Sequence, residues 1–222
     1  MDDRAALARI WPFFGLEVRT PRLVLRYPTD ADLVVLAGLT GDIHDPDFLP
    51  FHLPWSLAPE AERERRSLQF HWRGRGQLTA DDWQLPFVTV VEGEVVGTQD
   101  VLATGFATRR TVESGSWLHR PRQGQGLGRE MRAAMLQLAF EGLGAERAES
   151  GAYEGNAASL AVTRSLGYRS NGDAVRDDGG RGWRRELRFV LDRATWEQRR
   201  RDDIELVGVQ PCLELLGAGP PA

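Results

Sequence analysis

The sequence predicts a mixed α/β domain of the α+β class, and two features of the order of its segments carry this prediction. Before residue 120, strand-like segments follow one another through short turns, behind two helical segments. From residue 110 onward the order becomes strand, glycine-rich loop, helix, strand, helix and strand. Strands joined by tight turns pair antiparallel, and the helices between strands cover a sheet. We therefore expect one mostly antiparallel central sheet with helices packed against it.

Length and composition fit one globular domain. The chain has 222 residues, of which 41% are hydrophobic and 27% charged, and this is enough for a sizeable core. We expect a single domain over residues 1–210, with its core at 16–200, and a C-terminal tail at 211–222 whose last residues are frayed. No apolar run reaches the length of a membrane span, and the acidic start of the chain is unlike a signal peptide. A cytoplasmic protein is therefore expected.

Charge and cysteine usage exclude several kinds of function. A net charge of −4 argues against a general nucleic-acid binder, which normally carries a basic surface. All 28 basic residues are arginine, which is typical of a genome that favours arginine codons; an enzyme that acylates protein lysines and avoids modifying itself is the alternative. The single cysteine, Cys212, excludes an internal disulfide framework and a cysteine-based metal site.

The first half of the chain alternates between strand-like and helical segments. Alternating apolar residues mark the strands, while capping and charged residues mark the helices. In chain order we expect a strand at Leu16–Tyr27 bent at Pro21, a helix at 29–39 capped by Thr29 or Asp30, a structured loop at Gly41–Trp55, a surface helix at 58–72, a polar break at 73–82, strands at 83–93 and 94–106 joined by a tight turn at Glu92–Glu94, and a strand at Arg110–His119.

The second half begins with the stretch RPRQGQGLGREM at 120–131 and then alternates helix and strand. A stripe of apolar residues at helical spacing, including two methionines, predicts a core-facing helix that Gly144 ends. In chain order we expect this helix at 129–144, with Met131, Met135, Leu138, Ala139 and Leu143 on its buried face, then a strand at 145–153, a helix from Asn156 to 167, a strand at 183–192, a helix at 193–203 and a last strand at 204–210 that could pair across a dimer.

The glycine-rich stretch has the composition of an anion-binding loop. Gly124, Gly126 and Gly128 let the backbone approach a ligand, and the N–H groups at the start of the following helix point toward an anion. Arg122 and Arg129 add positive charge. Without a lysine it cannot be a nucleoside-triphosphate P-loop, and its spacing does not fit a dinucleotide fingerprint. A pyrophosphate fits; an ordinary glycine turn ahead of a helix is the alternative.

Four motifs in order resemble the GNAT superfamily of acyl-CoA-dependent N-acyltransferases. The loop resembles that superfamily's pyrophosphate loop, and NAASLAVTRSLGY resembles a segment of the branch that acetylates ribosomal-protein N-termini. TPRLVLR and ELRFVLDRATW are similar to the opening and closing strands of that branch, so the resemblance covers residues 16–200. Within the branch, HDPDFLPFHLPW and ESGSWL are similar to an actinobacterial subgroup with a succinyl-CoA-dependent member.

The resemblance implies a fold and a donor site. It implies helices on both faces of a sheet whose fourth strand, ESGSWLH, splays from the fifth, ERAESGAY, so that pantetheine enters the gap. The donor is acetyl-CoA or succinyl-CoA, with no metal, and the acceptor amine attacks the thioester directly. One N–H of the ESGSWLH strand would polarise the thioester carbonyl. The residues implied in donor binding are Trp117, Leu118, Gln123, Gly124, Gln125, Gly126, Leu127, Gly128, Arg129, Asn156 and Ser159.

The catalytic residues are less well defined by the resemblance. Many members protonate the departing thiolate with a tyrosine, and the corresponding position here is Thr163, so Ser159 or water is left for that role, with Asn156 beside the sulfur. For the general base that accepts the amine proton, Glu113 is the first candidate. Glu154 and His119 are weaker ones. For each, a solvated surface side chain is the alternative.

The loop at Gly41–Trp55 stands on the acceptor side of such folds. We expect its aromatic residues, Phe48, Phe51 and Trp55, to form an apolar wall or to pack beneath one. Its polar residues are expected to cap turns or face the substrate rather than bind a metal; they are His44, Asp45, Asp47 and His52. If the donor carries a carboxylate, Arg109 or Arg110 is available to bind it.

The sequence leaves two functional classes and several acceptors open. The first class is an N-acyltransferase, whose acceptor is a protein N-terminus, a lysine or a small-molecule amine. The second is a catalytically silent acyl-CoA sensor, favoured by the missing tyrosine. Cys212 lies far from every motif and is not expected to act as a nucleophile.

Overall fold

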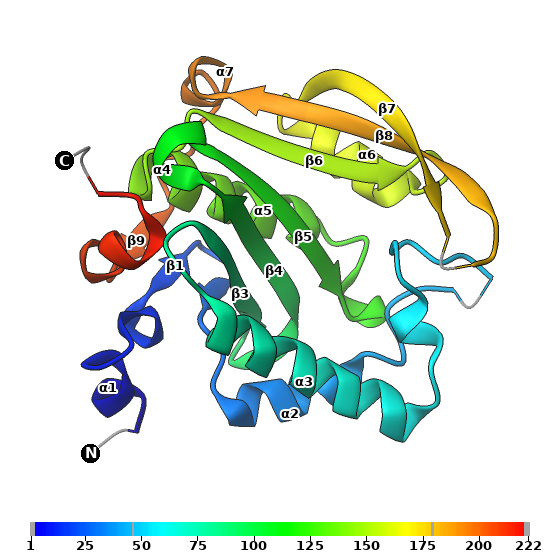
Figure 1. The fold of residues 1–222 in the computed structure, drawn as a ribbon, viewed down its shortest axis with the longest axis horizontal. Helices are drawn as coiled ribbons and strands as arrows, with labels where there is room; N and C mark the ends of the chain where they lie inside the picture. The colour runs from blue at the N-terminus through cyan, green and yellow to red at the C-terminus, as the bar shows by residue number, and fades with distance from the viewer. Residues whose placement is uncertain (1–2, 46, 179, 220–222) are drawn as a thin grey trace.

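The computed structural model describes residues 3–45, 47–178 and 180–219. Within these residues nine strands form one sheet, in the order β7-β8-β6-β5-β4-β3-β2-β1-β9 (Figure 1). Every neighbouring pair is antiparallel except β5 and β6, which confirms the mostly antiparallel α+β fold. The strands are β1 Glu17–Arg19, β2 Val24–Arg26, β3 Asp82–Val91, β4 Glu94–Thr104, β5 Thr111–Leu118, β6 Arg147–Tyr153, β7 Arg169–Asp177, β8 Trp183–Asp192 and β9 Glu205–Val207.

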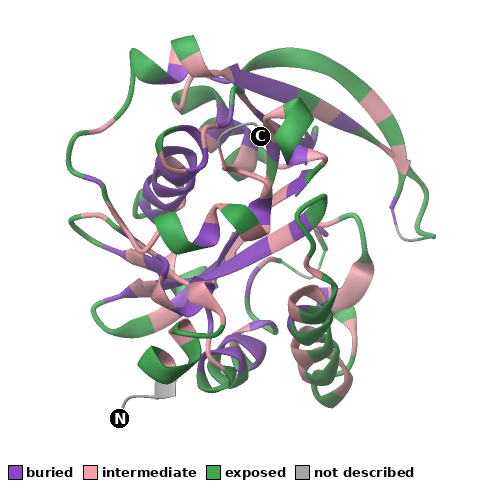
Figure 2. Cartoon of the chain, turned by 60° about the vertical axis from the view of Figure 1, so that its left-hand side comes forward, coloured by how far each residue is buried: buried purple, intermediate pink, exposed green. Residues whose placement is uncertain are grey.

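Helices cover both faces of this sheet. In Figure 1, α3 passes in front of the sheet and α5 lies behind it. Most of α5 is buried, whereas His71 is the one buried residue of α3, and Figure 2 shows this contrast in colour. The helices are α1 Asp3–Ala8, α2 Asp30–Leu39, α3 Glu60–Gln77, α4 Phe106–Arg109, α5 Leu127–Gln137, α6 Ala157–Ser165 and α7 Arg193–Glu197.

Local sequence explains where the helices beside the site begin and end. Thr29 caps α2 through a reciprocal capping box with Asp32. α5 turns its methionine stripe into the core, as its spacing predicts, and its last turn is π-helical at Leu138–Gly142. Gly144, with a φ of 74°, then reverses the chain, as expected of a glycine behind a helix.

The sheet divides between β5 and β6. These strands pair in parallel only from Thr111–Glu113 to Arg147–Glu149, and beyond those residues they separate. The expected splay between the ESGSWLH and ERAESGAY strands is therefore present. It leaves one edge of β5 without a neighbouring strand from Ser114 onward.

Several elements differ from the prediction, and the short helices α1 and α4 had no predicted counterpart. The strand expected at Leu16–Tyr27 is two short strands, because the chain turns where Thr20 accepts the backbone N–H of Leu23 and closes a hairpin. The surface helix continues through the expected polar break to Gln77, since arginine and glutamine favour a helix and the two glycines there are tolerated. β7 had no predicted counterpart, because its residues are almost all exposed and polar. The helix expected at 193–203 ends at Glu197.

The C-terminal segment belongs to the packed fold. β9 pairs with β1 of the same chain, so its inner edge is not available to a second copy. Cys212 and Leu216 are fully buried, and Trp83 Nε1 donates to the Leu216 carbonyl at 3.0 Å. The expected tail at 211–222 is therefore packed at least to residue 216; residues 220–222 lie outside the described residues. No helix of the described residues is long and apolar enough to cross a membrane.

Candidate acyl-donor and acceptor site

The free edge of β5 presents backbone groups to the gap. Leu118 of β5 lies opposite Gly97 of β4, and the hydrogen bond beside this pair runs from His119 N to Val96 O at 2.8 Å. Leu118 and Gly97 are therefore a non-hydrogen-bonded pair, so the N–H and C=O groups of Leu118 point away from β4 and into the gap. By alternation along the strand, Ser114, Ser116 and Leu118 face the gap. The backbone groups of Trp117, which were expected to pair with the donor, point toward β4, whereas those of Ser116 point into the gap.

The glycine loop joins the end of β5 to the start of α5. Gly124 and Gly126 have φ values of 72° and 80°, a conformation that residues with a side chain rarely adopt. Gly126 is the N-cap of α5, whose first N–H groups therefore follow directly from the loop. Arg129, in the first turn, is exposed and forms no ion pair within the described residues. These are the features that favour an anion at a helix N-terminus, and they lie at the end of the gap.

Two residues of the TPRLVLR segment, to which no donor-site role was assigned, hold this loop in place. Arg22 Nη1 donates to the Gln125 carbonyl at 3.0 Å, and its Nε donates to Glu130 Oε2 at 2.6 Å. Thr20 Oγ1 donates to the other carboxylate oxygen at 2.6 Å. Burial raises the pKa of Glu130, but the hydrogen bonds from Thr20 and Arg22 outweigh burial and leave that pKa below its ordinary value. No sequence signal linked the β1–β2 turn to α5.

The two glutamines of the loop are engaged within the protein. Gln123 Nε2 donates to the carbonyls of Leu118 and Ile43, at 2.7 and 2.8 Å. Gln125 Nε2 donates to the Pro121 carbonyl at 2.8 Å. Both side chains shape the loop, so a role in donor binding is left to their backbone groups.

The start of α6 lies against the same helix. Asn156 Oδ1 accepts the Ser159 N–H at 3.1 Å, so Asn156 serves as the N-cap of α6. A Cβ placed on Gly128 would lie 3.8 Å from Val162 Cγ2, which shows how closely α6 packs on the loop. Thr163, at the position where many family members carry a tyrosine, is fully buried, and its hydroxyl has no hydrogen-bond partner among the described residues.

A buried arginine bridges the two separated strands. Arg132 of α5 is 5% exposed, and it donates to Ser116 Oγ on β5 at 3.3 Å and to Ser150 Oγ on β6 at 3.2 Å. It forms no ion pair within the described part of the chain, and its Nε has no partner. Among the described residues, the buried hydroxyl of Ser114 also has no partner, and that of Tyr168 lies near Arg132. Burial raises the pKa of Tyr168, and the nearby Arg132 opposes that shift. The gap therefore contains buried donors without a counter-ion.

A cavity of about 220 Å³ lies where β5 and β6 part. It carries carboxylates, guanidinium groups and one imidazole, and it includes serines on both sides of the gap. Its lining residues are His52, Glu113, Ser114, Glu149, Ser150, Gly151, Asn171, Arg176, Glu186, Arg188 and Phe189. Glu113 also lines a second cavity of about 280 Å³ under the end of α3. Glu113 therefore lies between the two cavities.

The three base candidates lie in different places. Glu113 is exposed, faces the first cavity and forms no ion pair within the described residues. Glu154 is paired with Arg185 at 3.2 Å. His119 lies beyond the end of β5, with its Nε2 3.5 Å from Asp42 Oδ2. Of the three, only Glu113 lines the cavity.

The α2–α3 loop contributes an aromatic wall. The rings of Phe51 and Trp55 are 5.0 Å apart, and Trp55 lies 6.5 Å from Trp117 of β5. Phe48 lies apart from them, under the guanidinium of Arg184 at 5.2 Å. No group of three or more potential metal ligands gathers among the described residues. His44 is hydrogen-bonded through both ring nitrogens inside the loop.

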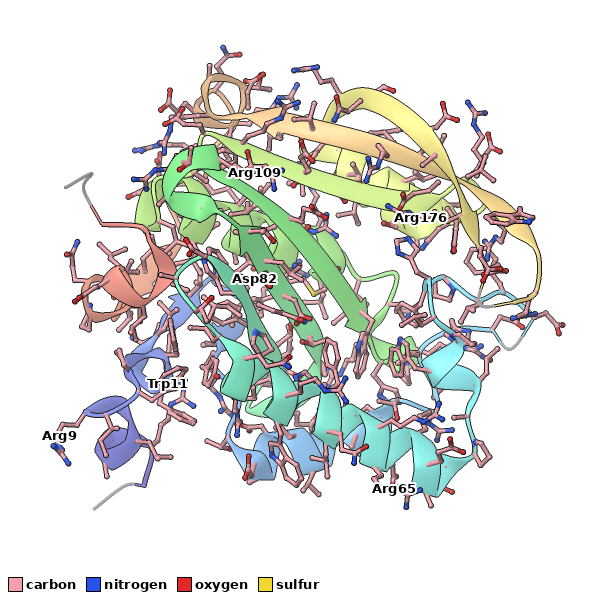
Figure 3. The ribbon with its side chains drawn as sticks, viewed as in Figure 1. Arg9, Trp11, Arg65, Asp82, Arg109 and Arg176 are labelled. Carbon is pink, nitrogen blue, oxygen red and sulfur yellow. The ribbon has the colours of Figure 1, made fainter. Side chains whose placement is uncertain are left out.

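The arginines expected to meet a donor carboxylate are elsewhere. Arg109 and Arg110 precede β5, whereas the glycine loop follows it, and an eight-residue strand spans roughly 25 Å. Arg109 is the last residue of α4 and donates to the Thr104 carbonyl (Figure 3). Arg110 Nη2 donates to the Gly219 carbonyl at 3.1 Å. Arg132, which the sequence did not single out, is the buried guanidinium that bridges β5 and β6.

Comparison with known proteins places this fold. The family model described as an acetyltransferase (GNAT) domain matches residues 22–169. The structure is similar to a GNAT-family acetyltransferase from Bacillus anthracis, with a TM-score of 0.64 and 18% identity over 80% of this chain and 99% of that one. It is also similar to RimJ of Mycobacterium smegmatis in complex with CoA-disulfide, with a TM-score of 0.61 and 18% identity over 89% of this chain and 92% of that one.

A third similar structure is RimL, a ribosomal L7/L12 α-N-protein acetyltransferase in complex with coenzyme A. Its TM-score is 0.60 at 18% identity, over 78% of this chain and 95% of that one. At such identities the structures establish the shared fold, and the family match over 148 of 222 residues establishes membership. The chain belongs to the GNAT family of acetyltransferases.

Proposed function

We propose that this protein transfers an acyl group from a coenzyme A thioester directly to a primary amine, through the gap between β5 and β6. The observation that supports this most is the alignment of three features along one edge of β5. An anion site stands at its C-terminal end, unpaired backbone groups follow, and a polar cavity opens where the strands part. Family membership supplies the class of reaction.

The donor lies along the free edge of β5 in this proposal. The N–H groups from Gly124 to Arg129 bind the pyrophosphate, with the Arg129 guanidinium as the nearby cation. The gap-facing backbone groups of Ser116 and the N–H of Leu118, whose carbonyl already accepts from Gln123, bind the pantetheine amides as an added strand would. One of their N–H groups polarises the thioester carbonyl and stabilises the oxyanion that forms on attack. Asn156 and Ser159 line the far side.

The position of Arg132 supports a donor that carries a carboxylate. A buried guanidinium without a counter-ion is unfavourable unless a ligand completes its hydrogen bonds. A succinyl group offers a carboxylate a few bonds beyond the thioester, whereas an acetyl group offers none. We therefore extend the donor range from acetyl-CoA to short dicarboxylic acyl-CoAs, with Arg132 as the carboxylate partner in place of Arg109 or Arg110.

The acceptor is a primary amine that approaches through the cavity beneath the α2–α3 loop. RimL is described as an α-N-protein acetyltransferase, and this favours a protein N-terminus as the acceptor here. Lysines and small-molecule amines remain within the proposal, because the cavity's carboxylates attract any ammonium group.

A donor and acceptor screen tests this function. Purified protein is incubated with acetyl-CoA or succinyl-CoA and a panel of amines: peptide amides beginning with serine, alanine or methionine, Nα-acetyl-lysine amide, spermidine and kanamycin. The proposal predicts release of CoA together with an acylated amine detected by mass. Thermal stabilisation by both donors without transfer to any amine would instead support the sensor.

A further inference from the structure

A histidine from the α2–α3 loop reaches the cavity where β5 and β6 part. His52 Nε2 lies 2.8 Å from Glu186 Oε1 on β8. Both side chains line the cavity that also contains Ser114 of β5 and Ser150 of β6. Arg132 of α5 reaches Ser150 from one face of the sheet, whereas a Cβ on the next residue, Gly151, would meet Glu186 on the other face. The imidazole therefore lies on the face opposite α5, which the proposed function assigns to the acceptor.

Glu186 is held so that it can orient this ring. It is 3% exposed, Arg176 Nε donates to its Oε2 at 2.6 Å, and Arg188 Nε lies 3.7 Å from the same oxygen. A Cβ at Gly151 would lie 2.6 Å from Oε1, so the glycine leaves room for the carboxylate to cross β6. Two guanidinium groups therefore lie against this carboxylate on the side away from His52 Nε2. In Figure 3, Arg176 lies on β7 near the α2–α3 loop.

The contact with Glu186 determines which ring nitrogen of His52 carries the proton. Glu186 only accepts hydrogen bonds, so the neutral ring of His52 carries its proton on Nε2 and donates it to Oε1. Nδ1 then keeps its lone pair, and it has no hydrogen-bond partner among the described residues. An imidazole oriented by a carboxylate, with its second nitrogen free, is the arrangement of a general base.

The loop that carries His52 is tied to the opposite side of the gap. Arg184 Nη1 of β8 donates to the Leu49 carbonyl at 2.7 Å. The His52 ring stands edge-on to Tyr153 of β6, with 5.3 Å between centroids. These contacts hold the ring at the cavity even though half of its side chain is exposed.

The remaining histidines of the chain are placed differently. His44 is hydrogen-bonded through both nitrogens within the loop. His71 is buried on α3, and burial lowers its pKa to about 4. His119 lies beside Asp42 at the end of β5. None of these three lines the cavity, so His52 is its single imidazole.

We propose that His52 is the general base of the acyl transfer and that Glu186 is its positioning residue; this rests on the proposed function. The amine lone pair forms the N–C bond at the thioester carbonyl, and the surplus N–H proton passes to His52 Nδ1. The C–S bond then breaks, and its electron pair leaves with the CoA thiolate. The imidazolium returns its proton through solvent to the thiolate. Glu113 and Glu149 attract the incoming ammonium group rather than accept this proton.

Three single variants of the full chain test this assignment: His52→Ala, Glu186→Gln and Glu113→Gln. Each variant is assayed with the donor and the acceptor amine that the wild-type protein uses fastest in the screen. For His52→Ala we expect kcat/KM to fall by about 10² to 10⁴, the usual contribution of general-base catalysis. The dissociation constant for acetyl-CoA should not change, because the ring lies on the acceptor side. Added imidazole should restore part of the rate, since it supplies the missing base.

The other two variants separate positioning from charge. The titratable and charged groups that line the cavity with His52 are Glu113, Glu149, Arg176, Glu186 and Arg188, and the Tyr153 ring packs against it. The rate should fall at low pH, where the general base is protonated, and this fall is the acidic limb of the pH–rate profile. Glu186→Gln should shift the acidic limb and lower kcat. His52→Ala should remove the limb. Glu113→Gln should raise KM for the amine and leave the limb in place.

The outcomes distinguish this inference from the function on which it rests. If the His52→Ala protein transfers the acyl group at the wild-type rate, the inference is overturned and the proposed function stands. The same holds if the acidic limb of the pH–rate profile disappears in the Glu113→Gln protein rather than in the His52→Ala protein. A wild-type protein without transfer to any amine overturns both. A His52→Ala protein that loses activity without rescue by imidazole, and with altered donor affinity, shows a structural role and also overturns the assignment.

Discussion

Arg22 and Glu130 join the β1–β2 turn to the first turn of α5. The Arg22 Nε donates to Glu130 Oε2 at 2.6 Å, and the same side chain holds the Gln125 carbonyl of the glycine loop. The loop is therefore braced from a part of the chain about one hundred residues earlier. The anion site depends on this contact because the glycines alone do not restrict the loop to one conformation.

The first prediction concerns this brace. Arg22→Ala leaves the Glu130 carboxylate buried with one partner fewer, which should lower the free energy of unfolding by about 1–3 kcal/mol. It should also weaken acetyl-CoA binding, because the Gln125 carbonyl loses the Arg22 hydrogen bond that holds the glycine loop in place. Urea denaturation and calorimetric titration measure the two effects. Arg65→Ala, on the exposed surface of α3, is the control; equal effects from both variants would count against the brace.

The second prediction concerns the loop itself. Gly126→Trp should abolish donor binding, since a side chain there meets the space in front of the α5 N-terminus and the φ of 80° disfavours it. Gly172→Trp is a matched control, because Gly172 has a φ of 86° on the exposed β7 and open space around it. Acetyl-CoA titration of both proteins compares them. Unchanged affinity in the Gly126 variant would refute the loop assignment.

The third prediction concerns the buried guanidinium. Arg132→Met removes the proposed carboxylate partner while keeping a long apolar side chain. The variant should lose succinyl transfer by at least about tenfold relative to acetyl transfer, because a hydrogen bond to a charged group is worth about 1.5–3 kcal/mol. Competition between the two donors in one reaction measures the ratio. An equal loss with both donors would indicate that Arg132 acts on the thioester instead.

The fourth prediction concerns stability and pH. Burial raises the pKa of Asp100 to about 6, and the hydrogen bonds from Thr98 and Gln84 oppose but do not cancel that shift. Between the unfolded pKa near 4 and about 6, the folded state therefore binds the proton more tightly, so stability falls as pH rises through this window and then levels off.

Asp100→Asn should remove this dependence and stabilise the protein above pH 6 by about 2–3 kcal/mol, the equivalent of the pKa shift. Urea denaturation of both proteins at pH 4.5, 6 and 7.5 measures it. If the free energies of unfolding of the wild-type and Asp100→Asn proteins differ by the same amount at all three pH values, the prediction is wrong.

The fifth prediction concerns the single cysteine. Burial raises the pKa of Cys212 to about 12, so the thiol stays protonated and unreactive in the folded protein. A thiol reagent should label it only after unfolding, and Cys212→Ala should keep the full rate of transfer. Rapid labelling of the native protein, together with a loss of activity, would revive a covalent mechanism.

Local patterns predicted most of this fold. The methionine stripe of α5, the capping residue Thr29 and the turn at Glu92 each act within a few residues, so sequence spacing was sufficient to find them. β7 was missed because tertiary pairing with β8, rather than an apolar face, makes it a strand. The hairpin between β1 and β2 was missed because its strands are only three residues long.

The donor loop could be predicted from sequence, but the side chains around it could not. Glycine spacing before a helix is a local signal, whereas the contacts from Arg22 to Glu130 and from Arg132 to Ser150 join distant segments. The pairing of His52 with Glu186 spans an even longer separation, and nothing near either residue indicates the other. In the sequence, the charged residues of β5 and β6, such as Glu113 and Glu149, are indistinguishable from solvated surface residues; only the fold shows that they line one cavity.

Acyl transfer in the amine panel, followed by mass spectrometry of the amines, tests the central claim most directly. The account predicts that the wild-type protein adds an acyl group from a CoA thioester to at least one primary amine, and that the Gly126→Trp protein adds none. Wild-type protein that binds acetyl-CoA and succinyl-CoA but leaves every amine unmodified would contradict it.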